Sequence, residues 1–124
     1  MTAHTLARAA YGRPEAATRT PRAIEYDLLA RVTHRLCTSM APGASFASLA
    51  QALHENRILW NALAVDVAAE GNGLPADLRA RLFYLAEFTE AHSRKVLAGG
   101  ATAAALIEVN TAVMRGLRPV EIRR

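Results

Sequence analysis

Cysteine is almost absent from this sequence, since Cys37 is the only one among 124 residues. A single cysteine cannot form an internal disulfide, which fits a protein kept in a reducing compartment. No stretch approaches the ~20 consecutive apolar residues that a membrane-spanning helix needs. The N-terminus also lacks the apolar region and cleavage site of a secretory signal. We therefore expect a cytoplasmic protein that does not enter a membrane.

Aromatic residues are also scarce, at 6% of the chain, although 52% of the residues are hydrophobic. A chain of this length is the size of one domain and can bury a core, which must be mostly aliphatic and alanine-rich. Runs of β-branched residues, which favour strands, are absent, whereas alanine, leucine, arginine and glutamate are good helix formers. The composition therefore predicts a single-domain, all-α fold.

Residue patterns typical of catalysis are missing as well. His54 and Glu55 begin like the helical HExxH zinc motif, but Ile58 occupies the place of the second histidine. One ligand does not make that site. The glycine turn at 71–73 lacks the lysine and the hydroxyl residue of a phosphate loop, and no spacing suggests a nucleophile. We therefore expect no enzyme activity, no bound metal and no cofactor.

The remaining titratable side chains are expected to be structural. The four histidines lie on different segments, and a metal cluster would require folding to gather them: His4, His34, His54 and His92. We interpret His92, which falls on an apolar stripe, as a hydrogen-bonded residue at the boundary of the core. Glu87 and Glu90 are expected on a solvated helix face.

Acidic residues are the minority, with 11 against 15 basic residues and a net charge of +4. Every basic residue except Lys95 is arginine. An arginine excess suits an anionic partner such as a nucleic acid, but richness in arginine and alanine also follows from the nucleotide composition of a genome. The charges are dispersed, without a block of five of one sign, which favours the second explanation. We do not expect direct contact with nucleic acid.

Apolar residues at helical spacing predict two long helices in the first half of the chain. The first begins at Pro21, with Thr20 as its N-cap, and ends near residues 42–43. Its apolar stripe and the residues that broaden it are Ile24, Leu28, Val32, Leu36 and Met40, with Tyr26, Leu29 and Cys37. The second helix runs from about Ser45 to Ala69. Its core face comprises Phe46, Leu49, Leu53, Trp60, Leu63 and Val67.

Two further helices are predicted in the second half. The third opens at Pro75 and ends at residues 99–100. Its core stripe comprises Leu78, Leu82, Leu85, Thr89, His92 and Val96. Thr102 caps the fourth helix, which Gly116 and Pro119 end. Its apolar residues are Leu106, Ile107, Val109, Val113, Met114 and Leu117.

Four helices with short connections predict an antiparallel helical bundle. We divide the chain into an N-terminal arm with a short helix and a loop at residues 1–19, a bundle at 20–117 and a charged tail at 118–124. No internal repeat and no second domain are visible in the sequence.

Polar residues interrupt the apolar stripes in three short motifs: Pro21-Arg22-x-x-Glu25-Tyr26, Asn56-Arg57-x-x-Trp60 and Asn110-x-x-x-Met114-x-Gly116-Leu117. A polar group in an apolar stripe is costly unless it is hydrogen-bonded or presented to a partner. Trp60 is therefore either a core aromatic with a satisfied polar tip or an anchor for a partner. Asn110 either ties neighbouring backbone together or contacts a partner.

If these motifs bind a partner, they supply the candidate partner-binding residues. These are Tyr26, Asn56, Ile58, Leu59, Trp60, Leu63, Asn110, Met114 and Leu117. Around Trp60 the second helix is apolar on nearly all sides, so this fold or a partner must bury it on more than one side. A partner site here requires residues 58–63 and the surface near Met114 and Leu117 to be partly exposed in the isolated protein.

Taken in order along the chain, these motifs and the segments between them resemble the FlaF family of flagellar biosynthesis regulators. The matching segments are Ala10-Tyr11, Thr20-Pro21-Arg22-x-x-Glu25-Tyr26, Val32-Thr33, Leu53-x-x-Asn56-x-x-Leu59-Trp60-x-x-Leu63-Ala64-x-Asp66, Gly71-Asn72-x-Leu74-Pro75-x-x-Leu78-Arg79-Ala80 and Leu106-Ile107-x-Val109-Asn110-x-x-x-Met114-x-Gly116-Leu117. They span about residues 10–117, and their shared order and spacing make the resemblance specific.

The resemblance implies an all-helical cytoplasmic protein of flagellated alphaproteobacteria. Members of the family are needed for flagellin production and export, and they are thought to bind flagellin as a secretion chaperone. They work beside a second regulator, FlbT, which acts on flagellin messenger RNA. The resemblance brings no enzyme activity, no cofactor and no list of binding residues.

The leading hypothesis is a flagellin-binding export chaperone that holds an amphipathic flagellin segment in an apolar groove. One alternative is a regulator that acts on flagellin messenger RNA directly or with FlbT, although no stacking aromatics accompany the arginines. Another is a structural dimer or adaptor whose apolar stripe closes on a second copy. The sequence leaves the oligomeric state open.

Overall fold

A computed structural model of the chain describes residues 21–117, with the side chains of residues 26–116, and shows four helices there. They are α3 (Pro21–Ser39), α4 (Phe46–Ala68), α5 (Ala76–Leu97) and α6 (Ala104–Leu117). Residues 21–117 contain no strand, so the predicted all-α fold is confirmed. The predicted arm at 1–19, the Thr20 cap and the tail at 118–124 lie outside the described residues.

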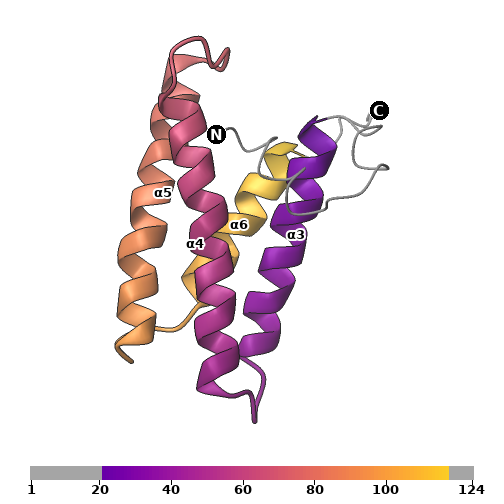
Figure 1. The fold of residues 1–124 in the computed structure, drawn as a ribbon, viewed down its shortest axis with the longest axis vertical. Coiled ribbons are helices and arrows are strands. Elements are labelled where there is room, and N and C mark those ends of the chain that lie inside the picture. The colour runs from indigo at the N-terminus through magenta and orange to yellow at the C-terminus, as the bar shows by residue number, and fades with distance from the viewer. Residues whose placement is uncertain (1–20, 118–124) are drawn as a thin grey trace.

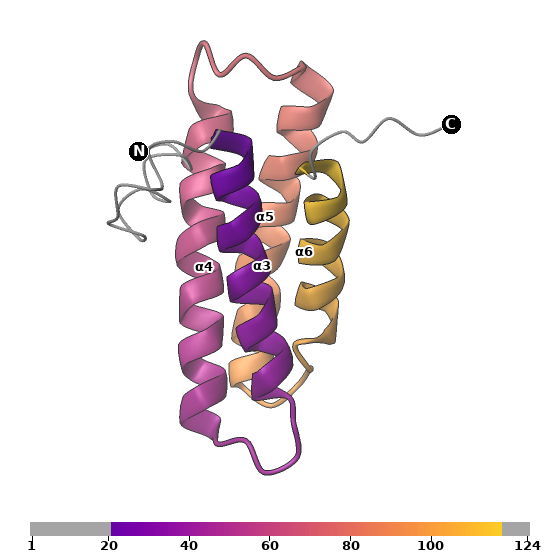
Figure 2. The ribbon, with the colours of Figure 1, turned by 90° about the vertical axis from the view of Figure 1, so that its right-hand side faces the viewer.

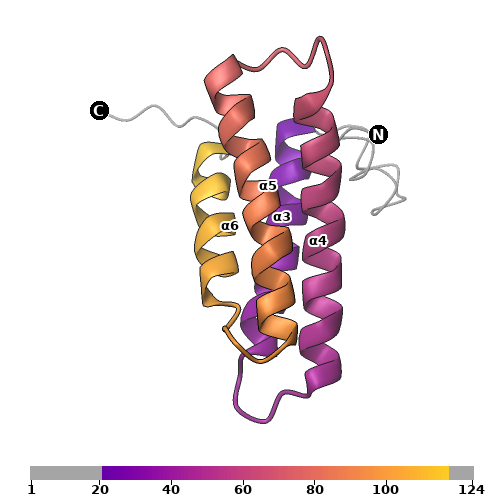
Figure 3. The same cartoon turned by 90° about the vertical axis from the view of Figure 1, so that its left-hand side faces the viewer.

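The helices form an antiparallel bundle in which each runs opposite to the one before it (Figure 1). Short connections join them at alternating ends. α3 packs against α4 and α6, and α4 packs against α5. Figure 2 shows α3 in front, between α4 and α6, and Figure 3 shows α5 in front on the opposite side.

Local sequence signals account for where the helices start and stop. Ser45 caps α4, because its hydroxyl accepts a hydrogen bond from the backbone N–H of Ser48 at 3.0 Å. Gly71 and Gly73, with φ of 78° and 92°, form the turn after α4 in a region of backbone space that favours glycine. Between them, the Asn72 side chain donates to the Asp66 carbonyl at 3.0 Å. The predicted bounds of the second helix and the predicted start of the third are therefore confirmed to within a residue, whereas the third helix ends at Leu97, before the predicted residues 99–100.

Two apolar clusters fill the interior. The upper cluster, toward the start of α3 in Figure 1, has buried residues Leu28, Leu29, Val32 and Leu59. The lower cluster has buried residues Leu36, Ala52, Leu53, Val96, Ala103 and Leu106. The upper cluster draws on α3 and α4, and Val113 and Met114 of α6 pack against it. α5 contributes buried residues only to the lower one.

Four residues assigned to apolar stripes lie at the surface instead. Met40 follows the end of α3, Phe46 begins α4 and is 63% exposed, and Leu78 lies in the first turn of α5. These positions are exposed because neighbouring helices cover a bundle end incompletely. Cys37 is exposed because it lies about 100° around the helix from the fully buried Leu36.

The fourth helix also differs from its predicted end. Gly116 was expected to stop the helix, but it lies inside α6, which reaches Leu117. The predicted cap at the other end is confirmed, because the Thr102 hydroxyl accepts from the Ala104 backbone N–H at 3.3 Å. No helix within residues 21–117 is both long enough and apolar enough to cross a membrane.

Leu36 and Cys37 provide a direct test of which side of α3 faces the core. Leu36→Ala should lower the free energy of unfolding by about 2–5 kcal/mol, because it leaves a cavity in the lower cluster. Cys37→Ala, one residue further on, should change it by less than about 0.5 kcal/mol. Urea unfolding followed by circular dichroism measures both, and equal losses would contradict this orientation of α3.

Candidate functional site

Six buried polar side chains form a layer across the bundle. This polar layer consists of Thr33, Asn56, Trp60, Thr89, Ser93 and Asn110, each at most 6% exposed. Every one of the four described helices contributes at least one member. Buried polar groups are costly unless they are paired, so their hydrogen bonds decide whether the interior is stable.

Asn110 is the centre of the layer. Its Oδ1 accepts a hydrogen bond from Trp60 Nε1 at 2.8 Å. Its Nδ2 donates to Asn56 Oδ1 at 2.8 Å and to Thr33 Oγ1 at 3.0 Å. The Thr33 hydroxyl donates in turn to the Leu29 carbonyl at 2.7 Å. One amide side chain therefore joins α3, α4 and α6 through direct hydrogen bonds.

The polar layer lies between the two apolar clusters. On α4, Asn56 stands between Leu53 of the lower cluster and Leu59 of the upper cluster. On α6, Asn110 stands one turn after the buried Leu106 and one turn before Val113. The hydrogen-bonded layer therefore interrupts an otherwise aliphatic core at about its middle.

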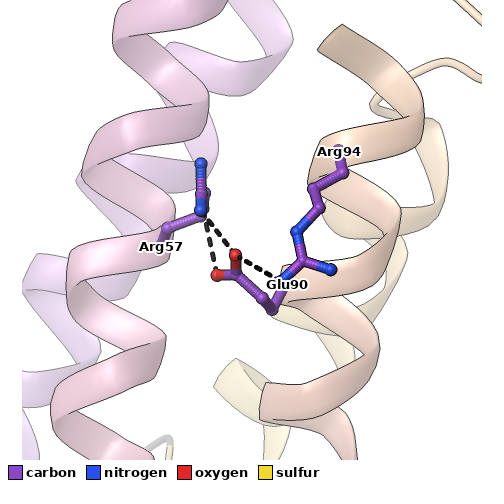
Figure 4. A network of polar contacts seen from close by, with 3 residues as sticks. All are labelled: Arg57, Glu90 and Arg94. Carbon is purple, nitrogen blue, oxygen red and sulfur yellow. Dashed lines mark hydrogen bonds and ion pairs between the residues drawn. The ribbon is translucent and has the colours of Figure 1, made fainter. Parts of the chain in front are cut away.

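A second polar network joins α4 to α5 at the edge of the bundle (Figure 4). Arg57 binds both carboxylate oxygens of Glu90, through Nε at 3.0 Å and through Nη2. Arg94, one turn further along α5, approaches the same carboxylate at 3.3 Å. The Arg57 hydrogen bond and the two positive charges hold the pKa of Glu90 below its ordinary value, although partial burial opposes this. Glu90 is thus an ion-pair partner between helices, not the solvated residue expected from sequence.

An open groove runs along the outer side of α3 and α4. Its floor is formed by Leu28, Val32 and Leu59, which also belong to the upper cluster. Ile58 forms one wall and is 44% exposed. The groove has a volume of about 310 Å³.

Charged residues line the rim of this groove. Arg31 and Arg35 lie one turn apart on α3, and Glu55 lies on α4. Arg35 Nη1 contacts Glu55 Oε2 at 2.8 Å, so an ion pair links the two helices at the rim. The groove therefore combines an apolar floor with a charged edge, as helix-binding surfaces do.

The structure divides the predicted partner-binding residues into three groups. Asn56, Trp60 and Asn110 lie inside the polar layer, where their polar atoms contact one another. Only Ile58 and Leu59 line the groove, as its wall and its floor. For Trp60, the structure shows the interior alternative, a core aromatic with a satisfied polar tip.

In the third group, Leu63, Met114 and Tyr26 belong neither to the polar layer nor to the groove lining. Leu63 and Met114 are partly buried against the upper cluster, and Tyr26 is partly buried on α3. Leu117 is the last residue of α6, and its side chain is outside the described part. The exposure expected of residues 58–63 holds for Ile58 but is wrong for Leu59 and Trp60, at 3% and 1%.

Sequence reasoning missed the α3 side of the groove. Leu28 and Val32 were assigned to the core stripe, and Arg31 and Arg35 received no role. The signal that could have found them is the arginine pair, one helical turn apart, that borders an apolar stripe. A single-helix pattern does not reveal which neighbouring helix leaves that border open.

The three histidines of the described residues are not gathered into a metal site. His34 and His54 are exposed on different helices, while His92 Nε2 bonds the Thr102 carbonyl at 2.9 Å and confirms the boundary position expected for it. His4 lies outside the described residues. Between residues 21 and 117, no group of three or more histidine, cysteine, aspartate or glutamate side chains could hold a metal ion.

The fold and its surface define a class: an all-helical bundle pinned by an internal polar layer, with an apolar groove open between two helices. Comparison with known families then identifies the chain. The family described as flagellar protein FlaF matches residues 7–117, and the chain belongs to that family. It is therefore a flagellar protein. Searches of curated proteins and of solved structures gave no match.

Asn110→Leu should destabilise the fold strongly. It leaves Trp60 Nε1 and Asn56 Oδ1 buried without partners, and each such group costs about 1–3 kcal/mol. We expect a loss of about 3 kcal/mol or more in the free energy of unfolding, measured with urea. Thr111→Ala is the matched control, because its hydroxyl bonds only within α6, to the Ile107 carbonyl. A loss no larger than that of the control would contradict the central role of Asn110.

Glu90→Gln should reduce stability in a pH-dependent way. The partly exposed ion pair contributes up to about 1 kcal/mol at neutral pH. Because the folded pKa of Glu90 is lowered, this contribution is present above the ordinary value of 4.5 and is lost as the pH falls through the folded pKa. The stability difference between wild type and variant should therefore shrink below pH 4.5, in urea titrations at several pH values.

The control for this experiment is Glu87→Gln, which removes the same charge from an exposed position of α5. It should change the free energy of unfolding by less than about 0.5 kcal/mol. A Glu90→Gln effect that is constant from pH 7 to pH 3 would contradict the ion-pair explanation.

Proposed function

We propose that this flagellar protein is a cytoplasmic export chaperone that holds an amphipathic segment of flagellin in the groove between α3 and α4. By binding flagellin before export, it promotes flagellin secretion and filament assembly, and its occupancy feeds into control of flagellin synthesis. Membership of the FlaF family supports the flagellar setting. The observation that carries the proposal is an apolar groove whose wall residue, Ile58, stays 44% exposed.

The shape of this surface suits an added helix. Val65 follows Ile58 by two turns on the same side of α4 and is 55% exposed. The two side chains mark an apolar strip about 10 Å long, which continues past the groove floor. An amphipathic helix recognises such a strip through side chains spaced three and four residues apart. A segment of about three turns is enough to cover it.

The charged residues at the rim of the groove influence how a bound helix is oriented. Arg35 and Glu55 already neutralise each other at one position on the rim. At this point a bound helix therefore lies next to an ion pair and not next to an isolated charge. Exposed charges of this kind affect association rate and register more than total affinity. Ile58 and Val65, the exposed apolar side chains of the strip, therefore supply most of the binding free energy in this proposal.

The flagellin segment can also be released, because its binding costs conformational entropy. A segment that is disordered when free loses conformational entropy on binding, which offsets part of the interaction free energy. A short groove with one strongly exposed wall residue gives a reversible complex. Reversibility is what an export chaperone requires, because the flagellin must leave the complex before it is secreted.

Ile58→Glu should abolish or strongly weaken co-elution with flagellin in size-exclusion chromatography. The substitution places a carboxylate in the groove wall, where bound apolar surface would have to desolvate it. Because Ile58 is exposed, the fold itself should remain intact, which circular dichroism verifies. The host flagellins are mixed one at a time with purified full-length protein.

Phe83→Glu is the matched control, because Phe83 is 40% exposed but lies on α5, away from the groove. It should leave co-elution unchanged. Failure of the wild-type protein to bind any flagellin of its host would overturn the chaperone proposal. Light scattering on the same samples tests the dimeric alternative, since a dimer closed through Ile58 would become a monomer in the Glu variant.

A further inference from the structure

α5 is the one described helix that the direct hydrogen bonds of the polar layer do not reach. Asn110 connects α3, α4 and α6. Thr89 and Ser93 of α5 belong to the same layer, at 1% and 0% exposure. Their hydroxyls, however, have no hydrogen-bond partner in the protein.

The register of α4 and α5 brings these partner-free hydroxyls to the level of a partner-free donor. Arg57 pairs with Glu90, and Leu53 and Val96 both belong to the lower cluster, so these residues indicate the antiparallel register of α4 and α5. In that register Asn56, three residues after Leu53, lies at about the same level of the bundle as Ser93, three residues before Val96. Asn56 Nδ2 is buried and also has no partner in the protein.

Three orphan polar atoms in one buried layer are too costly to leave unpaired. Each buried donor or acceptor without a partner costs far more than an ordinary hydrogen bond returns, and native interiors rarely contain them. The polar layer has the short side chains of Thr89 and Ser93 on α5, whereas Leu53 and Val96 belong to the adjacent lower cluster. Helices in bundles pack with axes about 8–10 Å apart, so short side chains at one level of two neighbouring helices leave room for a small bridging molecule.

We propose that this position binds one buried water molecule, held by Asn56 Nδ2 and by the hydroxyls of Thr89 and Ser93. Water suits the set because a buried water typically makes about three hydrogen bonds to otherwise unpaired groups. It accepts from the Asn56 amide and donates to the two hydroxyl oxygens. A charged ligand would be expensive in a layer with no ionised side chain.

The bound water completes the polar layer. Through it, α5 joins the hydrogen-bonded network that Asn110 builds among the other three helices. The amide of Asn56 then uses both of its ends, since its Oδ1 already accepts from Asn110. This role is independent of flagellin binding, because the layer is buried and the groove is not part of it.

Thr89→Val tests the water site by removing a hydroxyl while keeping the shape of the side chain. If the hydroxyl holds water, the urea midpoint of the full-length protein falls, because the water loses a ligand. Ser93→Ala should act in the same direction. An unchanged or raised midpoint in both variants would overturn the proposal, because deleting an unpaired buried hydroxyl is neutral or stabilising.

Solution NMR gives a second readout that does not depend on stability. A long-lived water should show a nuclear Overhauser effect to the Asn56 side-chain amide protons, and the Thr89→Val, Ser93→Ala double variant should lose it. Ser39→Ala is the matched control, because it removes a buried hydroxyl that bonds the Leu36 carbonyl outside the layer. This control should keep the signal. A wild-type protein without the signal would overturn the proposal.

Discussion

The hydrogen bonds of Asn110 are the constraint on which the bundle depends. An amide side chain offers donors and an acceptor in fixed directions, and Asn110 uses both ends inside an aliphatic core. Apolar side chains tolerate small shifts of one helix along another, whereas buried amides do not. A slip of one residue turns a helix by about 100° and would leave several buried polar groups unpaired. The polar layer therefore fixes the register of α3, α4 and α6 together.

The register of these helices in turn decides which side chains lie at the surface of the bundle. With Asn56 and Trp60 directed into the interior, the helical turn between them places Leu59 at the floor of the groove and Ile58 in its wall. The same turn carries Arg57 to the α5 side, where it binds Glu90. An internal layer and an external groove are thus two consequences of one helical orientation. Residues that look like recognition elements in the sequence shape the groove without lining it.

Much of the fold could be predicted from local chemistry. Ser45 as a cap, the glycines after α4 and the proline before α5 act within a few residues of the backbone they terminate, so their effects are visible in sequence. The errors fall where burial depends on other helices. Phe46 fits an apolar stripe by spacing, but no neighbouring helix covers it at the end of the bundle.

The sequence by itself determined an all-helical chain, the positions of its helices, the absence of a metal-binding spacing and the family. Only the tertiary structure decided that Asn56, Trp60 and Asn110 satisfy one another and that Ile58 is left exposed. Asn110 meets its partners across 50 to 77 residues of sequence. A helical pattern records which face of one helix is apolar. It does not record which other helix meets that face, and burial and hydrogen bonding both depend on that meeting.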